Sequence, residues 1–339
     1  MAETEHQERK IPKATGAWNK SFFIQILIIV PFVIILIPSS FGRTKQFGDE
    51  LPVITDLWPA IPILAFVCFC REVFANRVFV KFADKYTPHK PEWTPEYRQF
   101  RVERRGMLIF KMIYFFIVSP LGVCLFKNED WVPHALGGEG KGDLSLLWEQ
   151  FPYTPKIPNL VIYYCIELAY HSHALIYHLA LPPRNDFYES LLHHIATLSL
   201  IILSYTNVCS RIGVLVMILH DIVDFYLYFS RTLDGMTPDG YTLVAFTGLV
   251  VSYLKYRLWV LPRYVIPGAY DAIHYIPEGA AFGHTTWFLL NALLVVLFIL
   301  HVYWFKLIIE MIQKIVGNKG IVDPHATKSA MNVNKEEKK

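Results

Sequence analysis

The stretch that decides the fold is ESLLHHIATLSLIILSYTNVCSRIGVLVMILHDIVDFYLYFSRTL, residues 189–233. It consists of two long apolar runs joined by the short segment NVCSRIG. Each run approaches the roughly 20 residues that a helix needs to cross a lipid bilayer. The stretch therefore predicts a hairpin of two membrane-spanning helices, at about 190–206 and 213–231.

Similar apolar runs recur along the whole chain. The sequence has 339 residues, of which 53% are hydrophobic, and its formal net charge is only +3. Hydropathy gives eight candidate spans: 21–38, 53–71, 107–126, 159–180, 190–206, 213–231, 241–262 and 285–309. We therefore expect an all-α polytopic membrane protein with about eight transmembrane helices. No basic stripe with interleaved aromatic residues occurs in the sequence, so a nucleic-acid partner is not expected.

Basic residues predict the orientation of the chain, because cytosolic loops are enriched in Lys and Arg. Residues 1–20 carry four such residues, the segment 71–106 carries nine and the tail after residue 310 carries six, whereas 264–284 carries none. Both termini are therefore expected in the cytosol. The expected division is a cytosolic segment 1–20, two helices within 21–71, a basic cytosolic loop 72–106, a helical core 107–310 and a largely disordered tail 311–339.

The apolar hairpin carries three histidines and two aspartates, which are His193, His194, His220, Asp221 and Asp224. Folding the hairpin about residue 209 brings His193 and His194 level with Asp224, and Asp221 level with Thr197. The two aspartates share one helix face because they are three residues apart. An ionised group deep in a bilayer costs about 2.5–3.5 kcal/mol, so we expect these groups to pair or to line a wet cavity.

Two interpretations of this cluster are open: a polar bridge between two helices, or a reaction centre. A carboxylate bonded to one imidazole nitrogen fixes the tautomer of the ring. The other nitrogen can then act as a general base or attack an activated carbonyl. The sequence contains no Gly-x-Ser-x-Gly motif, so histidine is the candidate nucleophile. Spacing alone leaves open whether His193 or His194 reacts.

Histidines in the preceding span raise the alternative of an iron-dependent lipid hydroxylase or desaturase. His171, His173 and His178 lie there with Glu167, and His193-His194 follow. A His-x-x-His-His box is missing, because residues 189–191 are Glu, Ser and Leu. We therefore expect no metal. His301, in the last span, is expected to lie too far from the hairpin to contribute.

The motif residues of the hairpin region resemble a known family. Asp186-Phe187, His193-His194, Ser204-Tyr205, Arg211-x-Gly213, His220-Asp221 and Asp224 resemble the Lag1 motif of the ceramide synthases, which are TLC-domain membrane proteins. Segments 146–171, 256–266 and 287–309 extend the resemblance over about 107–310. It implies a six-helix TLC bundle around a cavity open to the cytosol. The segment 72–106 is too short for the homeobox-like insert of many animal members, and FYLYFSRTL after Asp224 lacks the usual acidic-then-Lys pattern.

The resemblance implies an endoplasmic reticulum enzyme that transfers a fatty acyl group from acyl-CoA to the amine of a sphingoid base. It implies no cofactor, acyl-CoA being a substrate, and a homodimer. The implied catalytic residues are His193, His194, Asp221 and Asp224, supported by His220, Thr197, Ser204 and Tyr205. Candidate substrate-binding residues are Arg184, Arg231, Trp148, Tyr163, Glu167, His171 and Arg257.

The mechanism expected from these residues is covalent. His193 would attack the thioester and Asp224 would orient it, while His194 with Asp221 would take a proton from the sphingoid ammonium. Arg184, Arg231 and the basic segment 98–105 are candidates for the CoA phosphates, although topology alone also explains their charge. The region 264–284 resembles the segment that determines acyl-chain length in this family. Open alternatives are another acyl acceptor and a non-catalytic TLC protein that binds lipids.

Overall fold

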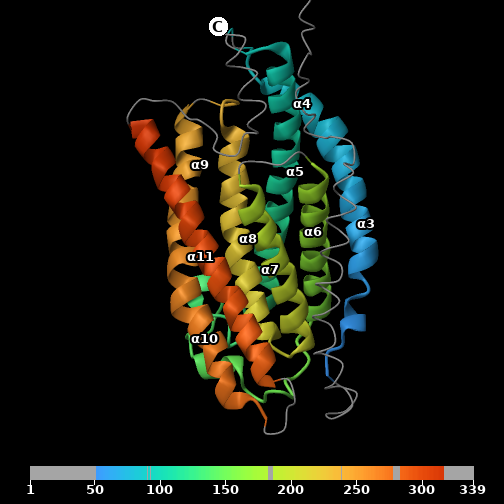
Figure 1. Ribbon diagram of the computed structural model, residues 1–339, viewed down its shortest axis with the longest axis vertical. Helices are drawn as coiled ribbons and strands as arrows, with labels where there is room; N and C mark the ends of the chain where they lie inside the picture. Colours follow the sequence, from blue (N-terminus) through green and yellow to red (C-terminus); the bar gives the residue numbers. More distant parts are fainter. Residues whose placement is uncertain are drawn as a thin grey trace, which may run out of the picture.

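The computed structural model describes residues 51–316, with gaps at 90, 92, 182–185, 238 and 278–282. Its long helices run alongside one another in an elongated bundle (Figure 1). The described residues form helices and no strand, as the sequence predicts. The elements are η1 (Ile54–Leu57), α3 (Ala60–Cys70), η2 (Arg71–Phe79), α4 (Val80–Tyr86), α5 (Pro95–Phe126), η3 (His134–Leu136), η4 (Leu144–Leu147), α6 (Leu160–Ala180), α7 (Phe187–Thr206), α8 (Ser210–Leu233), α9 (Asp239–Ser252), η5 (Tyr253–Val265), α10 (Ile266–Asp271), η6 (Ala272–Tyr275) and α11 (Gly283–Val316).

Within these ranges, six helical stretches are long and apolar enough to cross a membrane, which makes the chain a multi-pass membrane protein. They are Ile54–Tyr86, Pro95–Phe126, Phe187–Thr206, Ser210–Leu233, Gly240–Tyr275 and Gly283–Gln313. The segment 159–180, predicted as a span, forms helix α6, which is not among these six stretches and packs against α3 and α7. The span predicted at 21–38 lies outside the described residues.

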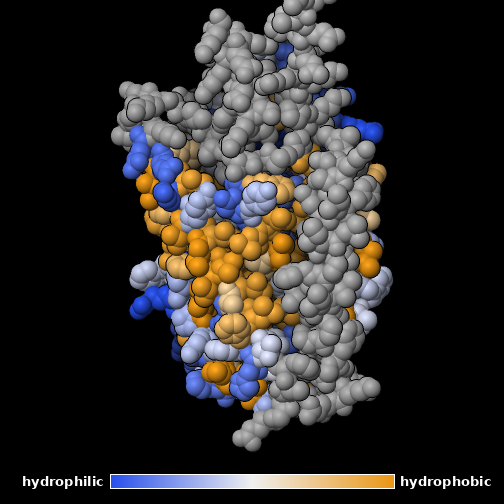
Figure 2. Space-filling view, in the orientation of Figure 1, coloured by the Kyte–Doolittle hydropathy of each residue, from blue (hydrophilic) through white to orange (hydrophobic). Residues whose placement is uncertain are grey.

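The outer surface of the bundle carries an apolar belt. Phe66, Val244 and Phe288 are 64%, 73% and 67% exposed, although all three are large and hydrophobic. Figure 2 shows the coloured part of one face as hydrophobic across its middle and hydrophilic toward both ends. Such a belt is what the hydrocarbon core of a bilayer requires of a protein that spans it.

The segment 72–106, whose cytosolic location stays a prediction, is helical over most of its length. α3 continues through the π-helical η2 into α4, which ends at Tyr86, and α5 begins at Pro95. The Thr94 side chain accepts a hydrogen bond from the Tyr97 amide at 3.1 Å, and proline occupies the first helical position. These local signals extend the helices beyond the apolar runs that hydropathy detects.

The predicted hairpin consists of α7 and α8, and its turn is short. Only residues 207–209 separate the two helices, and Val208 adopts a positive φ of 61°. The Asn207 side-chain amide donates to the Leu203 carbonyl at 2.9 Å. The Cys209 amide donates to the Ser204 carbonyl at 2.8 Å. The Cys209 bond satisfies a carbonyl at the end of α7, and the Asn207 side chain adds a second donor to the Leu203 carbonyl, which also accepts from the Asn207 backbone amide.

α8 lies at the centre of the bundle, where it packs against α5, α7, α9 and η5. The segment 127–158, which we call the cap, covers one end of α8. Arg211 at the start of α8 donates to the carbonyls of Leu146 and Glu149 in the cap, at 2.5 and 3.2 Å. Trp148 of the cap donates to the Gly268 carbonyl of α10 at 2.7 Å. The cap is thereby joined to both α8 and α10.

Candidate active site

A cavity lies between α7, α8 and α11, and the space among its lining atoms, open solvent included, is about 970 Å³. His171, His193, Thr197, Asp221 and Asp224 lie among the residues of its wall. The remaining lining is mostly apolar and continues to Trp148 of the cap, Ala272 of η6 and Thr286 of α11.

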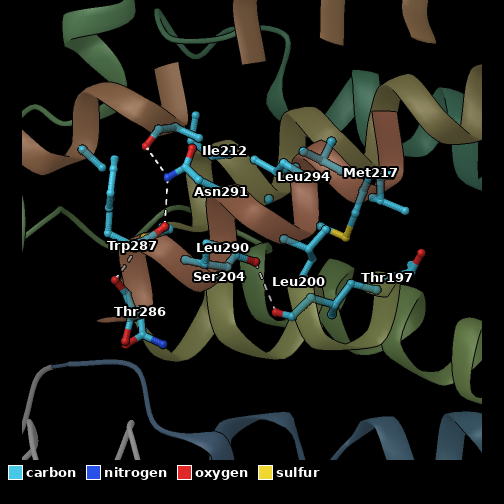
Figure 3. A pocket seen from close by; sticks show the side chains of 18 of the residues that line it. Thr197, Leu200, Ser204, Ile212, Met217, Thr286, Trp287, Leu290, Asn291 and Leu294 are labelled. Atoms are coloured by element: carbon cyan, nitrogen blue, oxygen red, sulfur yellow. Dashed lines mark hydrogen bonds between the residues drawn. The ribbon is translucent and has the colours of Figure 1, made fainter. Parts of the chain in front are cut away.

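The apolar wall of the cavity is built from three helices. Leu200 of α7, Met217 of α8 and Leu290 and Leu294 of α11 gather along it (Figure 3). A wall of this kind suits an alkyl chain, because burying apolar surface is favourable at about 25 cal/mol per Å². The cavity therefore combines a group of ionisable side chains with room for a long apolar ligand.

His193 and His194 have different surroundings. His193 lines the cavity, and its ring centroid lies 5.3 Å from that of Trp304. His194 does not occur among the described lining residues, and its ring lies 5.2 Å from the ring of His178 on α6. Successive residues are rotated by about 100° around a helix, which separates the two rings. Of the pair, His193 is the residue that a ligand in the cavity can reach.

Asp224 forms an ion pair that the sequence analysis did not predict. Its Oδ1 lies 2.8 Å from a guanidinium nitrogen of Arg257 in η5. Arg257 also donates to the His220 carbonyl at 3.2 Å and lies over the Tyr253 ring. Among the contacts of the described residues there is no hydrogen bond between Asp224 and His193, so the expected His–Asp pair is not formed directly. Equal depth in the hairpin did not determine the direction in which each side chain points.

His301 contacts the hairpin, and the expectation that it lies too far away is wrong. Its Nε2 is 2.7 Å from Nε2 of His220, and its ring lies 6.5 Å from that of His193. His220 Nδ1 lies 2.6 Å from the Val216 carbonyl, which can only accept, so this nitrogen carries hydrogen. His220 Nε2 therefore accepts from His301. A histidine inside an apolar span is itself a signal of a polar partner.

Three further side chains converge beside the cavity. One ligand atom from each of Glu167, His171 and Asp221 lies within 4.8 Å of the other two, and this is the group in the described residues that could hold a metal ion. Glu167 is completely buried and Asp221 is 1% exposed. The Tyr163 hydroxyl donates to Asp221 at 3.4 Å. All four residues were predicted site residues, and the structure brings them together.

The other predicted site residues differ in their location relative to the cavity. Ser204 lines the cavity and its hydroxyl lies 3.0 Å from that of Tyr164. Tyr205 donates to Asp56 at 3.0 Å and so joins α7 to η1. Arg231 is half-buried near the end of α8 and is not part of the described lining. Arg184 lies outside the described residues.

Arginines of the predicted basic segment are held by neighbouring groups at the opposite end of the bundle from the cap. Arg105 donates to the Thr87 hydroxyl at 2.7 Å and also to the Asp234 carbonyl. Arg101 lies 3.5 Å from the Asp234 carboxylate. We call this group the basic end of the molecule. It joins α5 to the link between α8 and α9, which is a structural role as well as a source of positive charge.

Comparison with known proteins identifies the family. Residues 107–310, more than half of the chain, match the family model of the TLC domain. The chain belongs to the TLC-domain family. The matched region contains every described residue that lines the cavity, from Trp148 to Leu297. The cavity is therefore a feature of the TLC domain itself.

Several curated relatives of this TLC-domain protein are ceramide synthases by name. Ceramide synthase LOH1 of Arabidopsis thaliana is 27% identical over 83% of this chain and 89% of its own length. Ceramide synthase hyl-2 of Caenorhabditis elegans is 26% identical over 84% of this chain and 86% of its own. ASC1-like protein 3 of Oryza sativa is 25% identical over 80% of this chain and 94% of its own. The similarity thus extends well beyond the hairpin motif.

Proposed function

We propose that this protein is a ceramide synthase, an acyltransferase that moves a fatty acyl group from acyl-CoA to the amine of a sphingoid base. One observation carries the proposal: within a TLC domain, His193 faces a cavity whose wall is apolar over most of its length. A lipid acyltransferase needs this combination of a nucleophile and a dry place for an alkyl chain. The names of the curated relatives support the same activity.

The proposed reaction begins with attack by a ring nitrogen of His193 on the thioester carbon of acyl-CoA. A carbon–nitrogen bond forms, the carbon–sulfur bond breaks, and CoA leaves as its thiolate. The acyl group stays on His193 while its chain lies along Leu200, Met217 and Leu294. An acyl-imidazole reacts readily with water, and these apolar side chains exclude water from it.

Asp224 and its partners stabilise the positive charge that develops on His193. Asp224 lines the same cavity and is held by Arg257 at 2.8 Å. In this proposal its carboxylate stabilises the acyl-imidazolium through space, in place of the direct hydrogen bond that the sequence predicts. The His220–His301 pair joins this part of α8 to α11, and the His220 carbonyl accepts a hydrogen bond from Arg257.

The second half of the reaction is attack by the amine of the acceptor on the acyl carbon, which gives the amide and frees His193. We place the protein in the endoplasmic reticulum membrane, with both termini in the cytosol, and propose that it works without a cofactor. A homodimer is part of the same proposal. The acyl-CoA head would approach from the basic end, where Arg101 and Arg105 lie.

The proposal is tested in microsomes from cells that lack their own ceramide synthases and express this chain. Labelled acyl-CoA and sphinganine are supplied, and both N-acyl product and free CoA are followed. Ceramide is expected from the wild type. His193→Ala should lose it by about 1,000-fold or more, since a covalent step cannot be replaced by neighbouring groups. His194→Ala should retain acyl transfer, because His194 does not face the cavity.

Other outcomes change the conclusion. Release of CoA without ceramide would assign a different acceptor to the same acyl-enzyme. No release of CoA by well-folded protein would show a TLC protein that binds lipids without acyl transfer. Loss of activity in His194→Ala but not in His193→Ala would reverse the assignment of the nucleophile.

A further inference from the structure

We propose that Glu167, His171 and Asp221 form the binding site for the ammonium group of the acyl acceptor, and that the two carboxyl groups accept its proton. The inference rests on the proposed function and adds to it the site of the second substrate. It also replaces His194 as the partner of Asp221 in taking that proton.

The first argument is geometric. Ligand atoms of the three side chains lie within 4.8 Å of one another, and His171 Nε2 is 3.5 Å from Glu167 Oε2. Asp221 and His171 line the cavity, whereas Glu167 lies behind them and is completely buried. A group bound to Asp221 would therefore occupy the same cavity as an acyl group on His193.

The second argument is charge. Asp224 has the guanidinium of Arg257 as its partner at 2.8 Å. Neither Glu167 nor Asp221 forms an ion pair with a Lys or Arg among the described residues, and the two buried Glu167 oxygens have no hydrogen-bond donor there from outside the three-residue group. Two carboxyl groups this close and this deeply buried repel each other unless a cation or a shared proton lies between them.

The third argument is that the acyl acceptor supplies the positive charge that the two carboxyl groups lack. A long-chain amine enters as an ammonium ion, which supplies positive charge and hydrogen-bond donors to two carboxylates. The apolar wall of the cavity can contact the alkyl chain of this amine. The Tyr163 hydroxyl, 3.4 Å from Asp221, occupies one side of that carboxylate and leaves the cavity side for the ligand.

The proton balance is complete with these groups. One ammonium proton moves to an Asp221 oxygen and is shared with Glu167, which frees the nitrogen lone pair. That nitrogen bonds to the acyl carbon as the bond from this carbon to His193 breaks. The second nitrogen proton passes to the vacated nitrogen of His193. Both protons are lost to water after the amide leaves.

The experiment separates the two half-reactions. Purified full-length protein is first loaded with labelled acyl-CoA, and the acyl-enzyme is then mixed with either sphinganine or hydroxylamine, which is mostly uncharged at pH 7. Glu167→Gln and Asp221→Asn are compared with the wild type. Glu310→Gln, an exposed glutamate on α11, is the matched control.

The expected result is selective. Both variants should form the acyl-enzyme as the wild type does. Their transfer to sphinganine should be slower by about 100-fold, the usual contribution of a positioned proton acceptor. Transfer to hydroxylamine should be unchanged, because an uncharged amine needs neither the charge nor the proton acceptor. Glu310→Gln should behave as the wild type.

Several results would overturn the inference: sphinganine transfer at the wild-type rate, equal slowing with hydroxylamine, or loss of acyl-enzyme formation in folded variants. Metal analysis of the purified wild type is included. A stoichiometric metal ion that Glu167→Gln loses, and that transfer requires, would make the three residues a metal site instead.

A binding measurement keeps this inference separable from the proposed function. Binding of a long-chain amine is compared with that of the alcohol of equal length. The wild type should prefer the amine by about tenfold, the effect of one charge-assisted hydrogen bond, and Glu167→Gln should lose that preference. If the wild type forms no acyl-enzyme, the proposed function fails, while this preference still decides the ammonium site. No preference in the wild type would overturn the site.

Discussion

At the scale of single residues, the polar groups of the cavity depend on one another. Asp224 is held by Arg257, whose backbone lies in the π-helical η5. A π-helical turn is wider than an α-helical one and often occurs at functional sites. Arg257 also contacts the backbone of α8 through the His220 carbonyl. The pair therefore joins η5 to α8 beside the cavity.

Removing one partner of this buried pair should be costly. Arg257→Gln is expected to destabilise the protein by about 3–5 kcal/mol, because it leaves the Asp224 charge buried without compensation. The double variant Arg257→Gln/Asp224→Asn should recover a large part of that loss. Thermal unfolding in detergent measures both effects.

Lys255→Gln provides the matched control, because Lys255 lies in the same η5 but is exposed and contacts only Tyr256 among the described side chains. Its unfolding temperature should equal that of the wild type. If the single and double variants at Arg257 prove equally unstable, the ion pair is not what stabilises this contact.

At the scale of the helices, the Tyr164 side chain of α6 reaches α8 because Gly213 has no side chain. A Cβ atom at this position would overlap the Tyr164 hydroxyl and lie 2.6 Å from Ser204 Oγ. The Tyr164 hydroxyl is also bonded to the Ser210 carbonyl at 3.1 Å. The glycine of the Arg-x-Gly element is thus required by packing between three helices.

Gly213→Ala should therefore destabilise the bundle by about 1–3 kcal/mol, the usual cost of overpacking a core. Tyr164→Phe in the same chain removes the oxygen that clashes and should restore part of the stability. Gly240→Ala is the control, since nothing lies within 4 Å of a Cβ atom there. Equal unfolding temperatures for Gly213→Ala and the wild type would show that the Tyr164 side chain can move away from Gly213 without cost.

At the scale of the whole molecule, the cavity extends from the ionisable side chains toward the cap. Trp148 of the cap, Ala272 of η6 and Thr286 of α11 line this far end, so three separate parts of the chain contribute to it. The region 264–284, which the sequence analysis connected with acyl length, supplies Ala269, Ala272 and Ile276 to this lining. An acyl chain attached at His193 would extend toward these residues.

Filling the far end should shorten the preferred substrate. Ala272→Phe is expected to reduce the use of the longest acyl-CoA that the wild type accepts by about tenfold or more relative to shorter ones. The ratio of products from a mixture of acyl-CoAs measures this shift. Val302→Phe, on the exposed surface of α11, should leave the profile unchanged. An unaltered profile in Ala272→Phe would mean that the chain does not reach the cap.

Much of this architecture is predictable from the residues alone. Apolar runs near 20 residues determine where helices cross the membrane, because no other secondary structure in a single chain segment satisfies its own backbone in lipid. The α7–α8 hairpin was predicted in this way, and with it the location of its histidines and aspartates within a membrane-spanning segment. The structure brings Glu167 and His171 together with Asp221, while their role as site residues stays a prediction.

The tertiary structure decided which of these side chains contact one another. Sequence period gives the depth of a residue and its relative rotation on one helix, but not how neighbouring helices are turned about their own axes. That rotation brings His193 rather than His194 to the cavity and places His301 against His220. It also directs Arg257, a residue of another helix, to Asp224. The sequence by itself determined which chemical groups enter the membrane, and the packing of the helices decided which of them meet.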